Sequence, residues 1–257
     1  MDLGLKDKVA IVTGGSRGIG RAIVLDLARE GCKVAFSARS EADLQNTAKD
    51  VAALGAEGLP IQADMTDAAD IERVVNEAVT AFGGIDILVN NVGGSRGGAI
   101  WDTTSADDWS MVFDLNFFGA VKTAQVVIPL MQQRGGGRII NISSIYGRES
   151  GGSMTYNASK ASMNSWSKGL AKQLAKDNIL VNVVAPGSIL FPGGSWERRQ
   201  QDNPEFIANF VKTDMPLGRF GRPEEVSAMV AFLASERASL MTGACVNVDG
   251  CQSRSNI

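Results

Sequence analysis

Residues 8–38 read "KVAIVTGGSRGIGRAIVLDLAREGCKVAFSA", and this stretch decides the fold. It begins and ends with short apolar runs rich in β-forming residues, which are typical of buried strands. Between these runs, "GGSRGIG" interrupts the first one, and "RAIVLDLAREG" has the apolar periodicity of a helix that ends at a glycine. The stretch therefore predicts a strand–helix–strand unit with a glycine-rich turn before its helix.

The same alternation continues along the chain. We expect further helices over about 41–54, 67–82 and 105–133 and from Met154 onward, with strands at "GLPIQA", "IDILVN", "GRIINIS" and "NILVNVVA". Strands that are apolar along their length and alternate with helices are typical of a parallel sheet covered by helices on both faces. The sequence therefore predicts a doubly wound α/β fold in which residues 1–257 form a single domain.

Two segments interrupt this alternation. The glycine-rich "GGSRGG" at 93–98 directly follows a strand, which is where ligand-binding loops of such sheets lie. Residues 187–215 carry proline, glycine and the aromatic residues Trp196, Phe206 and Phe210. We expect a substrate lid at about 188–215, with a packed subdomain or a subunit contact as the alternatives.

Composition limits the classes of protein to consider. The chain has 44% hydrophobic and 21% charged residues and a net charge of -3, so we expect a globular protein that does not bind nucleic acid. No uninterrupted apolar run approaches the roughly 18 residues of a spanning helix, and no signal peptide is recognisable, so we expect no membrane association. Cys32, Cys245 and Cys251 form neither an even disulfide set nor a C-x-x-C pair, which favours the reducing cytoplasm.

The chain contains no histidine, which removes the commonest acid–base catalyst. A Ser-His-Asp triad and a histidine-containing zinc site are excluded, and we expect no metal. Proton transfer near neutral pH must then come from a carboxylate, lysine, tyrosine or thiol with a shifted pKa. In "TYNASK", Tyr156 and Lys160 lie one helical turn apart and share a face of the helix.

The glycine-rich turn predicts a dinucleotide. Gly14, Gly18 and Gly20 allow the backbone to approach a pyrophosphate at a helix N-terminus. After the second strand, a carboxylate would bind the ribose hydroxyl of NAD, whereas arginine suits the 2'-phosphate of NADP. Arg39 follows that strand and Arg17 lies in the turn, so we expect NADP, with NAD still possible if both are ordinary surface arginines.

Several ordered motifs add to this pattern: "TGGSRGIG", "NNVG" at 90–93, "LNFFG", "NISS", "YNASK", "VNVVAPG", "PLGRFGRPEEV" and "FLASERASLMTGACVNVDG". With them, residues 5–252 resemble the short-chain dehydrogenase/reductase family. The resemblance implies a Rossmann sheet of seven parallel strands, often in a homotetramer. It also implies hydride transfer between a nicotinamide cofactor and a ketone or secondary alcohol.

The resemblance implies a catalytic set of Asn116, Ser144, Tyr156 and Lys160. A free phenol has a pKa near 10, and we expect the charge of Lys160 to favour the phenolate of Tyr156. Ser144 would bind the same substrate oxygen, although strand alternation alone leaves Ser143 open. Asn116 would hold a water that relays protons to Lys160, or would instead bond to backbone within a helix.

The resemblance also implies the cofactor contacts. The expected residues are Gly14, Ser16, Arg17, Gly18, Ile19, Gly20, Arg39, Asp64, Met65, Asn91, Gly93, Tyr156, Lys160, Pro186, Gly187 and Ile189. Asp64 would contact adenine; the alternative is a helix cap, a place that Asp67 fits better. Three positions depart from the family pattern: Phe191 replaces a threonine that often contacts the carboxamide, Val92 an alanine, and Cys251 a glycine.

For the substrate, overall similarity favours a 3-oxoacyl thioester on acyl carrier protein. Arg134, Arg138, Lys168 and Lys172 would offer a basic patch to such an acidic carrier. The alternative enzymes reduce a sugar, a polyol or a small ketone, for which Trp196, Arg198 and Arg199 are available. A catalytically silent dinucleotide sensor is a further alternative, against which the intact proton-transfer set argues.

Overall fold

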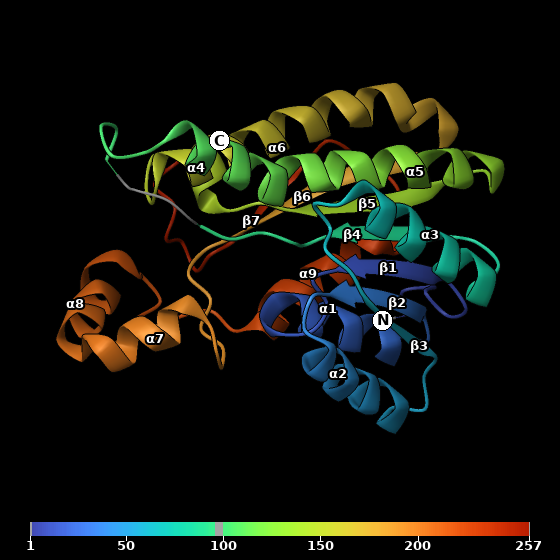
Figure 1. The fold of residues 1–257 in the computed structure, drawn as a ribbon, viewed down its shortest axis with the longest axis horizontal. Coiled ribbons are helices and arrows are strands. Elements are labelled where there is room, and N and C mark those ends of the chain that lie inside the picture. The colour runs from blue at the N-terminus through green and yellow to red at the C-terminus, as the bar shows by residue number, and fades with distance from the viewer. Residues whose placement is uncertain (1, 96–99, 257) are drawn as a thin grey trace.

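The computed structural model describes residues 2–95 and 100–256, which build one seven-stranded sheet (Figure 1). Its strands are β1 (Val9–Thr13), β2 (Lys33–Ala38), β3 (Gly58–Gln62), β4 (Ile87–Asn90), β5 (Gly137–Ile142), β6 (Ile179–Pro186) and β7 (Cys245–Val248). All neighbouring strands are parallel, in the order β3-β2-β1-β4-β5-β6-β7. The order reverses between β1 and β4, and ligands of doubly wound sheets bind at such a switch point. The predicted Rossmann fold is confirmed.

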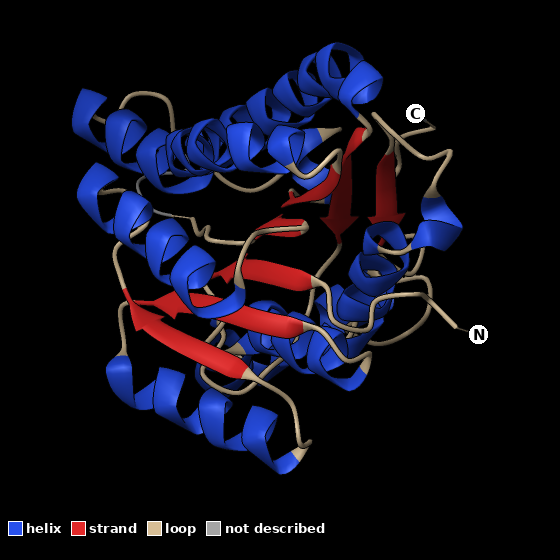
Figure 2. Ribbon diagram, turned by 90° about the vertical axis from the view of Figure 1, so that its right-hand side faces the viewer, coloured by secondary structure: helices blue, strands red, loops and turns tan. Residues whose placement is uncertain are grey.

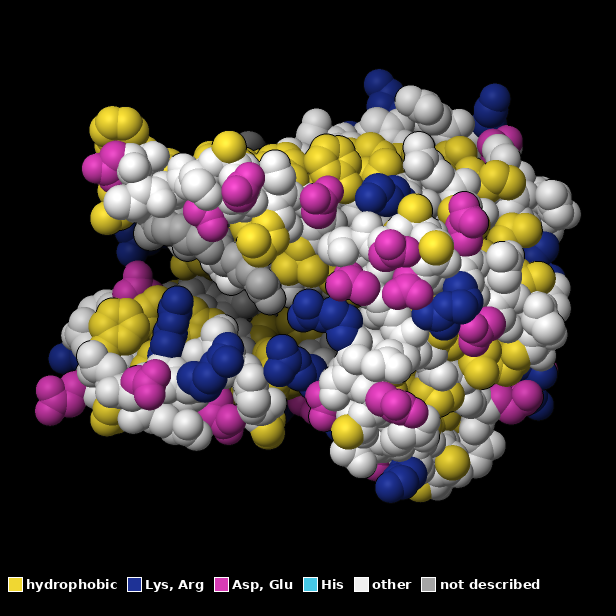
Figure 3. All heavy atoms as spheres, in the orientation of Figure 1, with side chains coloured by type: hydrophobic (Ala, Val, Ile, Leu, Met, Phe, Trp, Pro, Cys, Tyr) yellow, Lys and Arg dark blue, Asp and Glu magenta, His cyan; other side chains and the backbone are white. Residues whose placement is uncertain are grey.

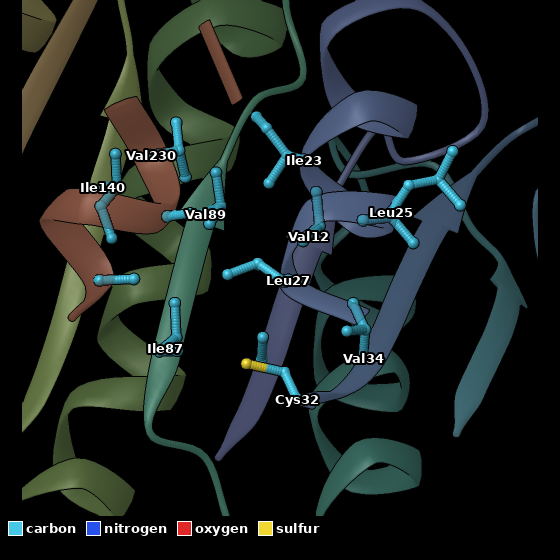
Figure 4. Packing of buried hydrophobic residues seen from close by; sticks show 14 of the residues in the cluster. Val12, Ile23, Leu25, Leu27, Cys32, Val34, Ile87, Val89, Ile140 and Val230 are labelled. Atoms are coloured by element: carbon cyan, nitrogen blue, oxygen red, sulfur yellow. The ribbon is translucent and has the colours of Figure 1, made fainter. Parts of the chain in front are cut away.

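Helices cover both faces of the sheet (Figure 2). One layer holds α1 (Gly18–Arg29), α2 (Glu41–Ala53) and α9 (Pro223–Ala234), and the other holds α3 (Ala68–Phe82), α5 (Gly119–Gln133) and α6 (Met154–Leu174). Alternate residues of β1 serve the two layers, since Ala10 and Val12 belong to the first core and Ile11 to the second. Figure 4 shows the first core, where α1 and α9 pack over the central strands.

The predicted helix over 105–133 consists of three pieces. After α4 (Ala106–Phe113), the π-helical segment η1 (Asp114–Phe118) widens the helix before α5 continues it. Gly119 begins α5 where a Cβ would lie 2.5 Å from the carbonyl oxygen of Met65, so only glycine fits this close approach. The wider turn brings Asn116, which is fully buried, toward the sheet.

The residues from Ala106 to Gln133 also satisfy, by length and composition, the requirements of a membrane-spanning helix, with a mean hydropathy of 1.3 in the most apolar window. The sequence prediction did not find this stretch because charged residues such as Asp114 and Lys122 interrupt the apolar runs. A third of that window is buried inside the protein. Ala124, Val127 and Met131 hold the stretch against the sheet, and its outer face carries further apolar side chains.

The segment at 188–215 forms two helices, α7 (Ser195–Asp202) and α8 (Pro204–Asp214), which extend from the sheet as a separate lobe (Figure 1). The lobe has an aromatic centre, because Trp196 stacks on Phe210 at 4.8 Å between ring centroids and contacts Phe220 at 5.2 Å. Of the three aromatic residues noted in the sequence, only Phe206 is half exposed. The space-filling view shows a notch between this lobe and the α4 end of the molecule (Figure 3). A lid function for the segment stays a prediction.

Candidate active site

The glycine-rich turn is locked to the neighbouring strand. Gly14 and Gly18 have positive φ angles of 69° and 53°, which glycine adopts without strain. The side-chain amide of Asn91 donates to the carbonyl oxygens of Thr13 (3.0 Å) and Gly14 (3.1 Å). A Cβ on Gly20 would lie 2.0 Å from the Gly14 carbonyl oxygen, so the helix can start this close to the turn only with glycine.

The turn presents an open helix end. The residue before α1, Arg17, provides no side-chain cap, so the first N–H groups of this helix are available to an anion. Ser16 is fixed from behind, because Thr47 on α2 donates a hydrogen bond to its carbonyl oxygen (3.2 Å). Ile19 packs against the core below. These features fit the pyrophosphate of a dinucleotide.

Arg17 and Arg39 are both exposed, and neither forms an ion pair with any residue in the described ranges. Arg39 directly follows β2, and its carbonyl oxygen accepts a hydrogen bond from Gln62 (3.0 Å). The residues after β2 include no carboxylate before Glu41, which is part of α2. Free guanidinium groups without a competing carboxylate suit a ribose phosphate better than a ribose diol.

The turn after β3 holds Asp64 and the buried Met65. Asp64 accepts hydrogen bonds from the backbone N–H (3.0 Å) and hydroxyl (2.9 Å) of Thr66, which fixes this carboxylate within its own turn. The cap of α3 is Asp67, whose side chain accepts from the N–H of Asp70 (3.0 Å). The preference for Asp67 as the cap is therefore confirmed.

Phe191 packs over the glycine-rich turn. A Cβ added to Gly18 would lie 2.7 Å from two ring carbons of Phe191, so the ring lies against the first residue of α1. The chain around it is held by pairing of Ile189 with Gly221, and Leu190 donates to the Gly221 carbonyl oxygen (2.9 Å). At the end of β6, Gly187 contacts Gln252, whose side-chain oxygen accepts from the Ser188 N–H (2.7 Å).

The loop after β4 connects the turn to the catalytic candidates. Asn116 donates to the carbonyl oxygens of Gly94 (2.8 Å) and Val112 (2.9 Å) and accepts from the Gly94 N–H (2.9 Å). Its amide is thus bonded to backbone, as in the second of the two interpretations left open by the sequence. A Cβ on Gly93 would lie 2.7 Å from the Asn116 side-chain oxygen and 3.1 Å from Lys160 Nζ. Arg96, Gly97 and Gly98 of the expected ligand loop lie outside the described residues.

Ser143 and Ser144 point in different directions at the end of β5. The hydroxyl of Ser143 donates to the carbonyl oxygen of Lys160 on α6 (3.3 Å). The hydroxyl of Ser144 accepts from the N–H of Tyr146 (3.1 Å) and is hydrogen-bonded with the phenol of Tyr156. This geometry supports Ser144 as the serine that faces the reacting centre.

Lys160 is almost fully buried, at 2% exposure, and its ammonium donates to the carbonyl oxygen of Ile142 (2.8 Å). Burial lowers its pKa to about 8. Its Nζ lies 5.7 Å from the centroid of the Tyr156 ring. The lysine is therefore held under the tyrosine by the edge of the sheet.

The pKa of Tyr156 is set mainly by burial. It is raised above its usual value, because desolvation disfavours the phenolate more than the hydrogen bond with Ser144 favours it. The effect of the Lys160 charge on this phenol therefore stays a prediction, since the pKa of Tyr156 is set by its burial, by Ser144 and by Tyr146. Tyr156 consequently keeps its proton at neutral pH.

The predicted basic patch for a carrier protein is only partly free. The guanidinium of Arg134 donates two hydrogen bonds to the carboxylate of Asp86 (3.1 and 3.2 Å). Arg138 is only 8% exposed, and its guanidinium donates to the backbone carbonyl oxygen of Gly137. Lys168 and Lys172 are both exposed; Lys168 donates to the carbonyl oxygen of Gly243 (3.0 Å), and Lys172 forms no hydrogen bond or ion pair with the described residues. Arg134 and Arg138 are thus held by partners within the fold, whereas Lys168 and Lys172 are exposed, and a carrier-binding patch stays a prediction.

The sequence interpretation missed two residues of this site. Thr13 accepts the N–H of Asn91 on its hydroxyl (3.0 Å), and Tyr146 lies beside Ser144. A signal existed for the second, since the chain has only two tyrosines and Tyr146 follows Ser144 by two positions.

Comparisons with known proteins agree with this geometry. The family model described as "Enoyl-(Acyl carrier protein) reductase" matches residues 14–251. The chain is 39% identical over 254 residues to 3-oxoacyl-[acyl-carrier-protein] reductase FabG of Thermotoga maritima, covering 96% of this chain and 98% of the relative. Among solved structures, L-sorbose reductase from Gluconobacter frateurii, complexed with NADPH and L-sorbose, superposes with a TM-score of 0.93 at 34% identity over 99% of this chain and 100% of the other. Levodione reductase superposes with a TM-score of 0.91 at 30% identity, over 97% and 99% of the two chains.

Proposed function

Because the chain belongs to the short-chain dehydrogenase/reductase family, we propose that this oxidoreductase uses NADPH to reduce a ketone to a secondary alcohol. The observation that carries the proposal is the link between the two halves of the site. Asn91 binds the glycine-rich turn, and Gly93, two residues later, lies against Lys160 and Asn116. A cofactor on the turn would thus be next to the group of Ser144, Tyr156 and Lys160.

The cofactor would be held by the turn at 14–20, by Arg39, and by the loop ends at Asp64, Asn91 and Gly187. When bound, it supplies the hydride that adds to the carbonyl carbon of the substrate. The two free arginines favour the phosphorylated form, NADPH, with NADH as the alternative.

The protein supplies the proton. Tyr156, whose raised pKa keeps it protonated well above neutral pH, donates its proton to the carbonyl oxygen of the substrate. Ser144 would orient the same oxygen, and Lys160, held by the Ile142 carbonyl group, would stabilise the phenolate that remains. Asn116 positions Gly94 and with it the loop beside Lys160. The proton lost by Tyr156 is then replaced from solvent.

The leading substrate class is a 3-oxoacyl thioester, carried on acyl carrier protein as in the named relatives. A small polar ketone such as a ketose is the second candidate. Two observations support it: Arg134 is paired with Asp86 and Arg138 is buried, so neither is free to bind a carrier protein, and the chain is similar to L-sorbose reductase. We further propose a cytoplasmic homo-oligomer, consistent with three free cysteines in the described chain.

The test is consumption of NADPH, run beside NADH, with an acetoacetyl thioester, a ketose and a small diketone. We expect NADPH-linked turnover of at least one of them. Tyr156→Phe should lower kcat by about 10²-fold or more, since it removes the proton donor, while NADPH binding measured by fluorescence stays within about twofold. Turnover retained by Tyr156→Phe would refute the mechanism, and tight NADPH binding without turnover by the unaltered protein would support the sensor interpretation.

A further inference from the structure

Both tyrosines of the chain meet at Ser144. The Ser144 hydroxyl accepts the backbone N–H of Tyr146 at 3.1 Å, and the Ser144 side chain also interacts with the phenol of Tyr156 and favours its ionised form. The two phenols also lie in electrostatic range of each other, because Tyr146 contributes to the raised pKa of Tyr156. A second phenol, which the mechanism above does not use, therefore lies within electrostatic range of Tyr156.

The ring of Tyr146 is fixed in place. A Cβ on Gly151 would lie 2.1 Å from one edge of the ring, and a Cβ on Gly152 would lie 3.3 Å from the other edge. Asn157 donates to the carbonyl oxygens of Tyr146 (2.9 Å) and Glu149 (2.8 Å), which ties this loop to α6. The loop thus holds the ring without a side chain at 151 or 152, and the hydroxyl has a defined direction.

The Tyr146 hydroxyl has no hydrogen-bond partner among the residues at 2–95 and 100–256. Its charged neighbours are Glu149, Asp214 at the end of α8, and Arg199 on α7. Desolvation and the two carboxylates raise the pKa of this phenol more than Arg199 lowers it, so the hydroxyl keeps its proton and can donate. The half-buried phenol consequently offers an unused hydrogen-bond donor on the side of α7 and α8.

We propose that Tyr146 determines specificity by donating a hydrogen bond to a second oxygen of the substrate, one or two carbons from the reacting carbonyl. Ser144 and Tyr156 would hold the reacting oxygen, and Tyr146, the neighbour of both, faces the adjoining part of the molecule. The inference rests on the proposed reductase function and deepens it. The expected substrates are therefore ketones that carry a second oxygen one or two carbons from the reacting carbonyl, such as 3-oxoacyl thioesters and α-hydroxy ketones.

A plain ketone would leave the Tyr146 hydroxyl without a partner in a partly desolvated site. Sites built to hydrogen-bond a substrate oxygen discriminate against analogues that lack it. A neutral hydrogen bond of ordinary strength corresponds to a preference of about tenfold.

The experiment compares kcat/KM for hydroxyacetone with that for butanone, which is similar in size and lacks the second oxygen, and repeats the comparison for an acetoacetyl thioester. In the unaltered protein we expect both oxygen-bearing substrates to exceed butanone. In Tyr146→Phe, kcat/KM for these two should fall about tenfold, while the value for butanone changes less than twofold. Tyr156→Phe is the matched control, because it removes the other hydroxyl and should abolish turnover of all three equally.

Three results would overturn the inference. An equal loss on all three substrates in Tyr146→Phe would mean that the ring only supports the site, and no loss on any would mean that the hydroxyl touches no substrate. If the unaltered protein reduces none of the three with NADPH, the proposed function itself fails and the inference falls with it. Because this last result concerns the unaltered protein, it is distinguishable from the other two.

Discussion

Lys160 shows the free-energy cost of burying a charged side chain. Its ammonium is buried at the edge of the sheet with one backbone carbonyl group as its hydrogen-bond acceptor. Burial lowers its pKa from 10.5 to about 8, so the folded state disfavours the charged form that the unfolded chain prefers. Proteins that bury such groups are commonly less stable than variants in which an apolar residue takes their place.

This predicts a pH-dependent stability difference for Lys160→Met. The penalty for burying the charge is fully present below pH 8 and disappears as the pH rises through the unfolded value of 10.5. A shift of this size corresponds to at most about 3 kcal/mol. We expect Lys160→Met to have a larger free energy of unfolding than the unaltered protein at pH 7. Urea unfolding at a series of pH values should show this difference shrinking by up to that amount as the pH rises to 10.5. A constant difference across this range would contradict the pKa shift.

At the same scale, residue types could be predicted from the sequence and residue environments could not. The Tyr156 and Lys160 pair follows from helical spacing, and the bond of Ser143 to the α6 backbone agrees with the choice of Ser144. The pKa of Tyr156 is raised mainly by its burial in the folded protein, which helical spacing alone does not predict. Arg134 looked free in the sequence because its partner Asp86 lies 48 positions away.

At the scale of elements, strands and most helices were predictable because their apolar runs are long and separated by glycine or proline. The π-helical turn at Asp114–Phe118 was not, since the apolar pattern of the sequence runs through it unbroken; Gly119, which follows it, lies against the Met65 carbonyl group across the fold. The 188–215 segment was recognised as an interruption, yet its two helices are held by an aromatic centre that also needs Phe220 from beyond it.

The segment after β6 and the N-terminal end of α1 are coupled through Phe191 and Gly18. Gly18→Ala should destabilise the protein because of its positive φ and because the new Cβ meets the Phe191 ring at 2.7 Å. Phe191→Ala removes the second cause only. In a double-mutant cycle measured by urea unfolding, we therefore expect a favourable coupling of about 1 kcal/mol between the two substitutions.

Gly14→Ala provides the matched control for that cycle. Its φ is similarly positive, but its Cβ would meet Asn91 and Val92 rather than Phe191. Gly14→Ala and Phe191→Ala should be additive within about 0.5 kcal/mol. Equal coupling in both cycles would show that Phe191 stabilises the whole turn rather than contacting Gly18 specifically.

At the scale of the molecule, the outer face of α4, η1 and α5 is more apolar than a free surface requires. Met111 and Phe118 are each 44% exposed and Trp109 is 36% exposed, and Phe113 and Phe117 join them in a chain of ring contacts. Hydrophobic side chains are visible along this part of the molecule in Figure 3. A patch of this kind marks an interaction surface, and a second copy of the chain is the partner that we propose.

Phe118→Glu should therefore reduce the oligomeric state, because it places a charge in the apolar patch, and light scattering after gel filtration measures the change. Phe206→Glu is the control, since Phe206 is exposed to 51% on α8, away from the patch, and should leave the mass unchanged. An unaltered protein that is monomeric at micromolar concentration would refute the proposal. If this monomer binds lipid vesicles through the same face, the apolar stretch serves a membrane instead.

The meeting of both tyrosines at Ser144 has a practical consequence. Biosynthetic replacement of tyrosine by a fluorinated analogue would give a protein with two fluorine resonances, both from residues that contact Ser144 in the proposed active site. Each can be assigned by one tyrosine-to-phenylalanine substitution. Because the chain has only these two tyrosines, a change in either fluorine chemical shift would report ligand binding near that phenol, with no signal from other residues and no need for turnover.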